Sequence, residues 1–331
     1  MSNRMLKPGD VVEVRTPAQI VETLDGDASV EGMPFMPEML RHAGKRFTVS
    51  ARAEKICDTV SDGLPRSLRL RDTVLLDDLR CDGSAHGGCQ AGCRLYWKES
   101  WLRRVEPDQV TEARGSDARA ELEKLAADAT RAVREVNGSI KETFRCQATE
   151  ALRAGKPLPR HGVIHYLRDL RSGNVSWSRF LRVMARALSG PIRRRLRLLR
   201  WQPLPAPDYV VPSKADLELE PGDLVEVRPT EEIARTVDER GRTRGLAFDW
   251  EMVPYCGGRY RVLDRVERII DESTGEMIEI ASDCLILDGV VCSGDHSDCR
   301  WFCPRAIYPY WREAWLRRVD DGEAVSSVRS G

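Results

Sequence analysis

The chain contains an internal duplication, and this feature limits the folds that it can adopt. The segment Pro8–Arg15 (PGDVVEVR) returns as Pro221–Arg228 (PGDLVEVR), with seven of the eight residues identical. A Trp-basic-Glu-x-Trp-Leu-Arg-Arg-Val motif follows each copy, beginning at Trp97 and at Trp311. Two matches in the same order predict two related modules of about 100 residues each. The expected parts of the chain are a first module, a connecting segment and a second module, at residues 1–110, 111–202 and 203–331.

Each module is expected to be mostly β-structure. A Pro-Gly-Asp turn begins an alternating apolar strand at residues 11–14, and the same pattern recurs at 224–227. Two runs with a period of two surround Ser-Thr-Gly within residues 267–280, which predicts a hairpin, and residues 54–70 are its counterpart. Short strands separated by turns are typical of small barrels. The expected fold class is therefore α+β, with two duplicated SH3-like β-barrel modules that each carry a cysteine-rich loop and are joined by a helical segment.

Four motifs of the first module carry a resemblance to known proteins. They are Phe35-Met-Pro-Glu-Met39, Cys57-Asp58, Cys81-Asp-Gly-Ser-Ala-His-Gly-Gly-Cys89 and Trp97-Lys-Glu99. In this set the chain resembles an uncharacterised bacterial family of cysteine-rich SH3-like repeat proteins. The opening Pro-Gly-Asp-x-Val-x-Val strand is similar to the first strand of the SH3-like barrel in nitrile hydratase β-subunits. The resemblance implies the fold of the modules and implies no activity.

The segment between the two modules, residues 116–200, is expected to be helical. Apolar residues at helical spacing form one stripe over residues 122–152, and Lys156–Pro159 ends this stretch. A second helix is predicted to begin after Ser176 and to end at Gly190-Pro191. Such stripes predict helices that pack against one another.

Ten cysteines in a chain whose start has no apolar signal segment indicate metal binding rather than disulfides. The two modules share the spacing Cys, three or four residues, His, two residues, Cys, three residues, Cys. The matching residues are Cys81, His86, Cys89 and Cys93 in the first module and Cys292, His296, Cys299 and Cys303 in the second. Several thiolates in a short glycine-rich loop converge readily on one cation, so two zinc ions per chain are predicted. An iron–sulfur cluster is the alternative cofactor.

The fourth ligand of each site is open to two interpretations. Each module has a further thiol on its hairpin, Cys57 in the first and Cys284 in the second. The preferred ligand sets contain four cysteines each, namely Cys57, Cys81, Cys89 and Cys93, and Cys284, Cys292, Cys299 and Cys303. His86 and His296 are the alternative fourth ligands, and Cys256 is a further thiol close to the second set. A closed four-ligand zinc site is structural, whereas an open position would make His86 and His296 candidate catalytic residues.

Charge is unevenly distributed, although the whole chain has 52 basic and 52 acidic residues. Residues 160–200 contain eleven arginines and one acidic residue, whereas residues 216–239 contain nine acidic residues and two arginines. The candidate anion-binding residues are Arg193, Arg194, Arg195, Arg197 and Arg200. We expect this arginine-rich segment to dock against acidic parts of the same chain. Binding to an anionic membrane or to nucleic acid is the alternative.

These features favour a cytoplasmic protein that binds or assembles partners and carries zinc in structural roles. No apolar run reaches the roughly 18 residues of a membrane span, and the sequence lacks the motifs of nucleotide-binding loops, serine hydrolases and zinc proteases. The alternative is a metalloenzyme of a biosynthetic pathway with an open zinc or iron–sulfur position. The repeated tryptophans are expected in the core, although a groove for a protein or peptide partner is the other interpretation. The sequence indicates no small-molecule substrate.

Overall fold

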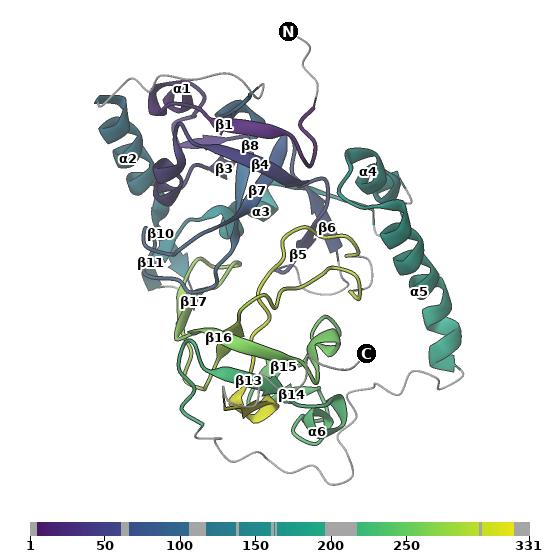
Figure 1. The fold of residues 1–331 in the computed structure, drawn as a ribbon. Helices are drawn as coiled ribbons and strands as arrows, with labels where there is room; N and C mark the ends of the chain where they lie inside the picture. The colour runs from purple at the N-terminus through teal and green to yellow at the C-terminus, as the bar shows by residue number, and fades with distance from the viewer. Residues whose placement is uncertain are drawn as a thin grey trace. The chain divides into compact units, whose positions relative to one another are not determined.

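Two compact units can be distinguished in the structure, which is a computed structural model (Figure 1). It describes residues 5–60, 66–105, 117–136, 139–159, 162, 164–195, 217–297 and 300–320. Unit 1 comprises Met1–Ala185, Arg268–Ile278 and Ser293–Ala306, and unit 2 comprises Arg186–Glu267, Glu279–Cys292 and Ile307–Gly331. The sheets are antiparallel, and the chain is a mixed α+β protein. Two short segments of the second repeat therefore belong to unit 1.

Unit 1 contains a five-stranded antiparallel sheet with the strand order β8-β7-β4-β1-β9. The strands are β1 (Val11–Val14), β4 (Arg46–Arg52), β7 (Thr73–Arg80), β8 (Arg94–Lys98) and β9 (Leu102–Arg104). In β1, Val12 and Val14 are buried whereas Val11 is exposed, because successive side chains of a strand point to opposite faces. The cysteine loop of the first repeat connects β7 to β8.

Unit 2 contains a four-stranded antiparallel sheet with the order β19-β16-β13-β20. The strands are β13 (Leu224–Val227), β16 (Arg259–Arg265), β19 (Leu285–Leu287) and β20 (Leu316–Arg318). Equivalent residues of the two repeats pair in the same register. Glu13 of β1 lies opposite Arg103 of β9, and Glu226 of β13 lies opposite Arg317 of β20. The two strands predicted after the Pro-Gly-Asp turns are therefore confirmed.

Shorter elements surround these sheets. In unit 1 they are α1 (Pro17–Val21), β2 (Ser29–Val30), β3 (Met33–Pro34), η1 (Pro37–His42), β5 (Ile56–Asp58), β6 (Arg66–Arg69), η2 (Glu99–Trp101), α2 (Asp117–Thr130), β10 (Arg131–Val136), β11 (Ser139–Phe144), α3 (Gln147–Ala154), β12 (Lys156–Pro157), α4 (Ile164–Ser172) and β17 (Arg268–Ile270). In unit 2 they are α6 (Thr230–Ala234), β14 (Arg242–Thr243), β15 (Leu246–Ala247), η3 (Val253–Tyr255) and η4 (Glu313–Trp315). Helix α5 (Trp177–Arg195) and strand β18 (Met277–Glu279) contain residues of both units. Strand β5 pairs with β6, and β17 pairs with β18, so both predicted hairpins are confirmed.

The repeated tryptophans form the centre of each core. Trp97 and Trp101 in unit 1, and Trp311 and Trp315 in unit 2, have no exposed surface. Phe35 packs edge-on against Trp101 with ring centroids 5.3 Å apart, and in unit 2 Phe248 packs against Trp315 at the same distance. These rings are core residues, as expected, and do not line a surface groove.

The prediction of a continuous helix through residues 131–144 is wrong. Helix α2 ends at Thr130, and the chain continues as the antiparallel hairpin β10–β11, in which Val133 and Ile140 are 71% and 82% exposed. Two sequence signals explain the difference. β-branched residues are frequent in this stretch, and the Asn137-Gly138 dipeptide between the two runs is typical of hairpin turns.

Helix α5 begins where predicted but does not end where predicted. The Ser176 hydroxyl accepts a hydrogen bond from the backbone N–H of Arg179 at 3.3 Å, which confirms the N-cap. The helix continues through Gly190-Pro191 to Arg195. A proline removes one helical hydrogen bond, and the good helix formers on both sides offset that cost. Among the candidate anion-binding arginines, the side chains of Arg193, Arg194 and Arg195, and the whole of Arg197 and Arg200, lie outside the described residues.

No helix in the described ranges combines the length and the apolar character that crossing a membrane requires.

Unit 1 brings together segments from both repeats. On β17, the carbonyl of Arg268 accepts a hydrogen bond from the backbone N–H of Gln90, in the cysteine loop of the first repeat, at 3.0 Å. On β5 of the first repeat, the carbonyl of Asp58 accepts a hydrogen bond at 2.7 Å from Arg300, in the cysteine loop of the second repeat. Each of these hairpin strands thus contacts the cysteine loop of the other repeat.

Replacing a buried tryptophan should destabilise the protein more than replacing an exposed one. Replacing Trp101 by Ala removes a fully buried ring and should lower the free energy of unfolding by about 3–5 kcal/mol. The matched control is Trp177→Ala, because Trp177 is 69% exposed, and this change should stay within about 0.5 kcal/mol. Urea unfolding of the two variants measures both values, and equal effects would contradict the assignment of Trp101 to the core.

Candidate metal centre

Three side chains that can ligate a metal converge in unit 1. Glu38 lies on η1, and Cys81 and His86 lie on the loop between β7 and β8. Sγ of Cys81 is 3.3 Å from Nε2 of His86, and the ligand atoms of the three residues all lie within 4.8 Å of one another. Within the described part of the chain, this is the one group of three or more His, Cys, Asp or Glu side chains that are so close. The structure thus brings together two predicted ligands and adds a carboxylate.

The loop wraps tightly around the sulfur of Cys81. The backbone N–H of Gly83 donates to this sulfur at 3.3 Å, and the carbonyl of Gly83 accepts from the N–H groups of His86 and Gly88 at 3.1 and 2.9 Å. Gly83 has a φ of +71°, and a Cβ at this position would collide with the carbonyl oxygen of Cys89. Only glycine therefore permits the turn that places His86 beside Cys81.

All three side chains are largely shielded from solvent, and burial shifts the pKa of His86 and of Cys81. Glu38 is 6% exposed, and within the described residues neither of its carboxylate oxygens has a nitrogen or oxygen donor. His86 is 1% exposed, and burial lowers its pKa, which favours the neutral imidazole. Burial, followed by the nearby Glu38 carboxylate, raises the pKa of the Cys81 thiol far above its ordinary value. A carboxylate in this environment is costly unless a cation compensates its charge.

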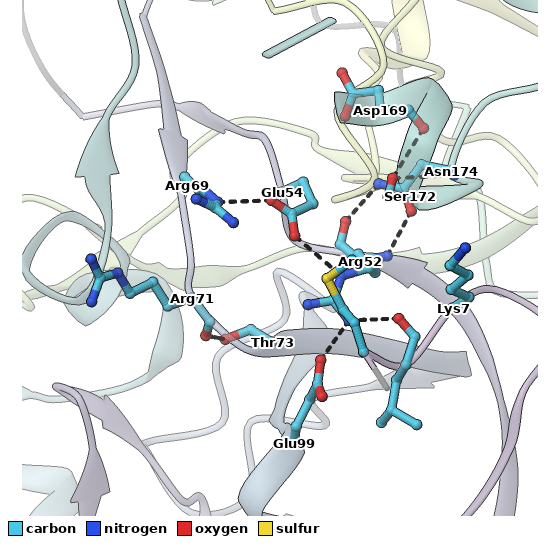
Figure 2. A network of polar contacts seen from close by, with 12 residues as sticks. Lys7, Arg52, Glu54, Arg69, Arg71, Thr73, Glu99, Asp169, Ser172 and Asn174 are labelled. Atoms are coloured by element: carbon cyan, nitrogen blue, oxygen red, sulfur yellow. Dashed lines mark hydrogen bonds and ion pairs between the residues drawn. The ribbon is translucent and has the colours of Figure 1, made fainter. Parts of the chain in front are cut away.

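Several other buried acidic side chains in unit 1 have cationic partners. Figure 2 shows the contacts of Glu54, which pairs with Nε of Arg52 at 3.2 Å and with Nε of Arg69 at 2.7 Å. The side-chain amide of Asn174 bonds both the backbone N–H and the carbonyl of Arg52, each at 2.8 Å. In this network the Glu54 carboxylate and the Asn174 amide are paired with groups of the protein, so its role is structural. Among the residues that the structure describes, no cationic side chain is paired with Glu38.

A second buried ion pair links β5 to α4. Nζ of Lys55, next to the start of β5, lies 2.6 Å from Asp169, and both side chains have no exposed surface. The ammonium group also lies 4.1 Å from the ring centre of Tyr166 and 5.1 Å from that of Phe302. Burial lowers the pKa of Lys55 and raises that of Asp169 to about 6. Each charge depends on the other, so the pair is a structural contact.

The three predicted cysteine ligands of the first loop do not form a single cluster, although the backbone N–H of Cys81 donates to the carbonyl of Cys93 at 2.8 Å. Sγ of Cys89 accepts a hydrogen bond from the backbone N–H of Ile270 at 3.4 Å. Burial raises the pKa of Cys93 to about 12. The sulfur atoms of Cys81, Cys89 and Cys93, which all belong to the described residues, do not gather within 4.8 Å of one another. In the converging group that contains Cys81, the other ligand atoms belong to an imidazole and a carboxylate.

Cys57, the predicted fourth ligand of the first repeat, lies beside Cys303 of the second. The backbone N–H of Cys57 donates to Sγ of Cys303 at 3.1 Å. Nη1 of Arg305 lies 3.8 Å from Sγ of Cys57, and Glu272 holds the same guanidinium at 2.7 Å. The hydrogen bond from the Cys303 thiol, followed by the charge of Arg305, lowers the pKa of Cys57 to about 6 against the opposing effect of burial.

The predicted ligands of the second repeat are divided between the units. Cys284, Cys292 and Cys256 belong to unit 2, His296 and Cys303 belong to unit 1, and Cys299 lies outside the described residues. Cys284 lines a cavity of about 450 Å³ in unit 2, together with Glu218, Glu220 and Glu313. Burial raises the pKa of Cys284 to about 11 and that of Cys256 to about 12.

Glu38 is the site residue that the sequence interpretation missed. It belongs to a Phe-x-x-Glu-Met motif that recurs in the second repeat with Glu251 in the same position. Both glutamates are buried. A repeated acidic residue between apolar neighbours, in a chain with repeated cysteine loops, was the available signal, because an isolated carboxylate is rarely kept inside a core without a partner.

The buried Lys55–Asp169 pair leads to a prediction about stability. Lys55→Met removes one charge and leaves the Asp169 carboxylate buried alone, so the free energy of unfolding should fall by about 3–5 kcal/mol. Lys141→Met is the matched control, because Lys141 pairs with Glu276 at 3.0 Å on a partly exposed surface and should cost at most about 1 kcal/mol. Chemical denaturation measures both. A loss as small as that of the control would mean that Asp169 does not need its partner.

Comparisons of the chain with protein-family models, with curated proteins and with solved structures find no match. The geometry of the side chains is therefore the basis for assigning a function. Within the converging group, Glu38 is the residue whose buried charge most requires a partner.

Proposed function

We propose that this chain is a zinc-binding protein with two related SH3-like modules, and that it acts in binding or assembly with its metal in a structural role. Glu38, Cys81 and His86 would hold one zinc ion. The observation that carries this proposal is the buried carboxylate of Glu38, which has no nitrogen or oxygen donor within the described residues and lies beside a thiol and an imidazole. A divalent cation would compensate its charge and that of the Cys81 thiolate.

The donor atoms favour zinc over the alternative cofactor. Carboxylate oxygen, thiolate sulfur and imidazole nitrogen are all ordinary ligands of Zn²⁺. An iron–sulfur cluster is held mainly by several thiolates, whereas this group contains one cysteine. Calcium and magnesium prefer oxygen ligands and would leave the sulfur and the nitrogen unused.

The positions of the ligands favour a structural role. Glu38 comes from η1, whereas Cys81 and His86 come from the loop after β7, so one ion would join two segments more than 40 residues apart in the sequence. Zinc that joins chain segments in this way contributes its binding energy to folding. Three protein ligands leave one tetrahedral position, and the metalloenzyme alternative requires that this position accept a substrate or a reactive water.

If Glu38 binds zinc, the change in melting temperature caused by Glu38→Gln should have opposite signs with zinc bound and with zinc removed. With zinc bound, the variant should melt below the wild type and bind zinc at least tenfold more weakly, because a ligand charge is lost (an order-of-magnitude estimate). With zinc removed by a chelator, the variant should melt at or above the wild type, because an uncompensated buried charge is lost. Thermal melts followed by circular dichroism, with zinc content from elemental analysis, measure both effects.

Cys146→Ala is the matched control for the site. Cys146 is buried like the ligands, at 8% exposure, and burial raises its pKa to about 11. This variant should keep the wild-type zinc content, whereas Cys81→Ala should lose the ion held by the first repeat. A wild-type melting temperature that does not fall when zinc is removed, or Cys81→Ala that retains every equivalent, would overturn the proposal. A stoichiometry of two ions per chain would support a second site in the second repeat.

Partners remain part of the proposal. For a binding or assembly role, we expect a protein or peptide partner. Association with an anionic membrane or with nucleic acid through the segment at 193–200 is the other candidate, and its arginine side chains lie outside the described residues.

A further inference from the structure

We propose that Cys57 and Cys303 are a redox-active pair that forms a reversible disulfide between the two sequence repeats within unit 1. The two residues are 246 positions apart in the chain, yet the backbone N–H of Cys57 donates to Sγ of Cys303 at 3.1 Å. This contact places Sγ of Cys303 against the backbone of the residue that carries the other thiol, so rotation of the two side chains can bring the sulfurs together.

The surroundings hold the two thiols together. Nη1 of Arg305 donates to the carbonyl of Cys57 at 3.2 Å and to Oγ1 of Thr59 at 2.9 Å. Arg300, on the other side of Cys303, donates to the carbonyl of Asp58 at 2.7 Å. The segment that carries Cys303 is thus bonded to β5 on both sides of the cysteine. These hydrogen bonds already restrict the motion of Cys303 relative to Cys57. Less conformational entropy is therefore lost when the disulfide forms.

The same arginine favours the reactive form of Cys57. The guanidinium of Arg305 is 5% exposed and lies 3.8 Å from Sγ of Cys57. A thiolate is the nucleophile in thiol oxidation, and a neighbouring cation stabilises it. Within the described residues, Cys57 and Cys303 belong to no group of three or more His, Cys, Asp or Glu side chains whose ligand atoms all lie within 4.8 Å of one another. The pair therefore fits two-thiol chemistry better than metal binding.

A peroxide is the oxidant that this pair would use. The Cys57 thiolate attacks one peroxide oxygen, the O–O bond breaks, and the leaving hydroxide takes up a proton to become water. Sγ of Cys303 then gives up its proton and attacks the sulfenic sulfur of Cys57. The S–S bond forms, the S–O bond breaks, and the second hydroxide leaves as water with that proton. Two thiols are oxidised and one peroxide is reduced to two waters, and a dithiol reverses the bond by exchange.

Peptide mapping of the full-length chain tests the pair directly. Reduced protein is treated with hydrogen peroxide, its remaining thiols are alkylated, and it is digested with trypsin. Cys57 lies in peptide 56–66 and Cys303 in peptide 301–305, each with one cysteine. Oxidation should remove both alkylated peptides and yield one linked species. Peptide 146–153, which contains the buried Cys146, is the internal control and should stay alkylated.

The outcomes separate this inference from the zinc proposal. Cys57→Ser should leave peptide 301–305 alkylated after peroxide, and Cys303→Ser should do the same for peptide 56–66. Both variants should keep the zinc ion proposed at Glu38, Cys81 and His86, because neither cysteine belongs to that group. Recovery of both alkylated peptides from oxidised wild-type protein would overturn the inference. Linkage of Cys57 to any cysteine other than Cys303 would also overturn it, whatever the zinc content.

Discussion

The buried carboxylate of Glu38 is the constraint on which the account of the site depends. It is 6% exposed, it has no nitrogen or oxygen donor within the described residues, and its neighbours at ligand distance are a thiol and an imidazole. Leaving such a charge alone in a core costs several kcal/mol, whereas a bound cation turns the same group into a stabilising contact. The tight turn at Gly83 contributes to this group, because it places Nε2 of His86 3.3 Å from the sulfur of Cys81.

The exchange of segments between the repeats explains why spacing alone did not reveal which strand lies beside each cysteine loop. From the order of residues, we predict that each cysteine loop and the hairpin before it belong to the same module. In unit 1, however, Cys89 of the first loop contacts Ile270 of the second hairpin, and Cys303 of the second loop contacts Cys57 of the first. Spacing within a loop reports which side chains can reach one another locally. It does not report which distant strand lies beside that loop.

Several features could be predicted from the sequence because they depend on local chemistry. The Pro-Gly-Asp turns begin strands in both repeats, and the tryptophans are core residues. The end of α2 could not be read from apolar spacing, since a stripe at helical intervals also crosses residues 131–144, where β-branched residues and Asn137-Gly138 favour a hairpin. Glu38 was missed because a single carboxylate has no spacing signature, and only its repetition as Glu251 marked it.

X-ray absorption at the zinc edge of the purified full-length protein tests the central claim most directly. We expect mixed coordination at the site of the first repeat, with about one sulfur near 2.3 Å and nitrogen or oxygen ligands near 2.0 Å. Comparison of the wild type with Cys81→Ala isolates the signal of that ion. A difference spectrum that requires three or four sulfurs, or a protein that binds no zinc, would contradict the assignment of Glu38 and His86 as ligands.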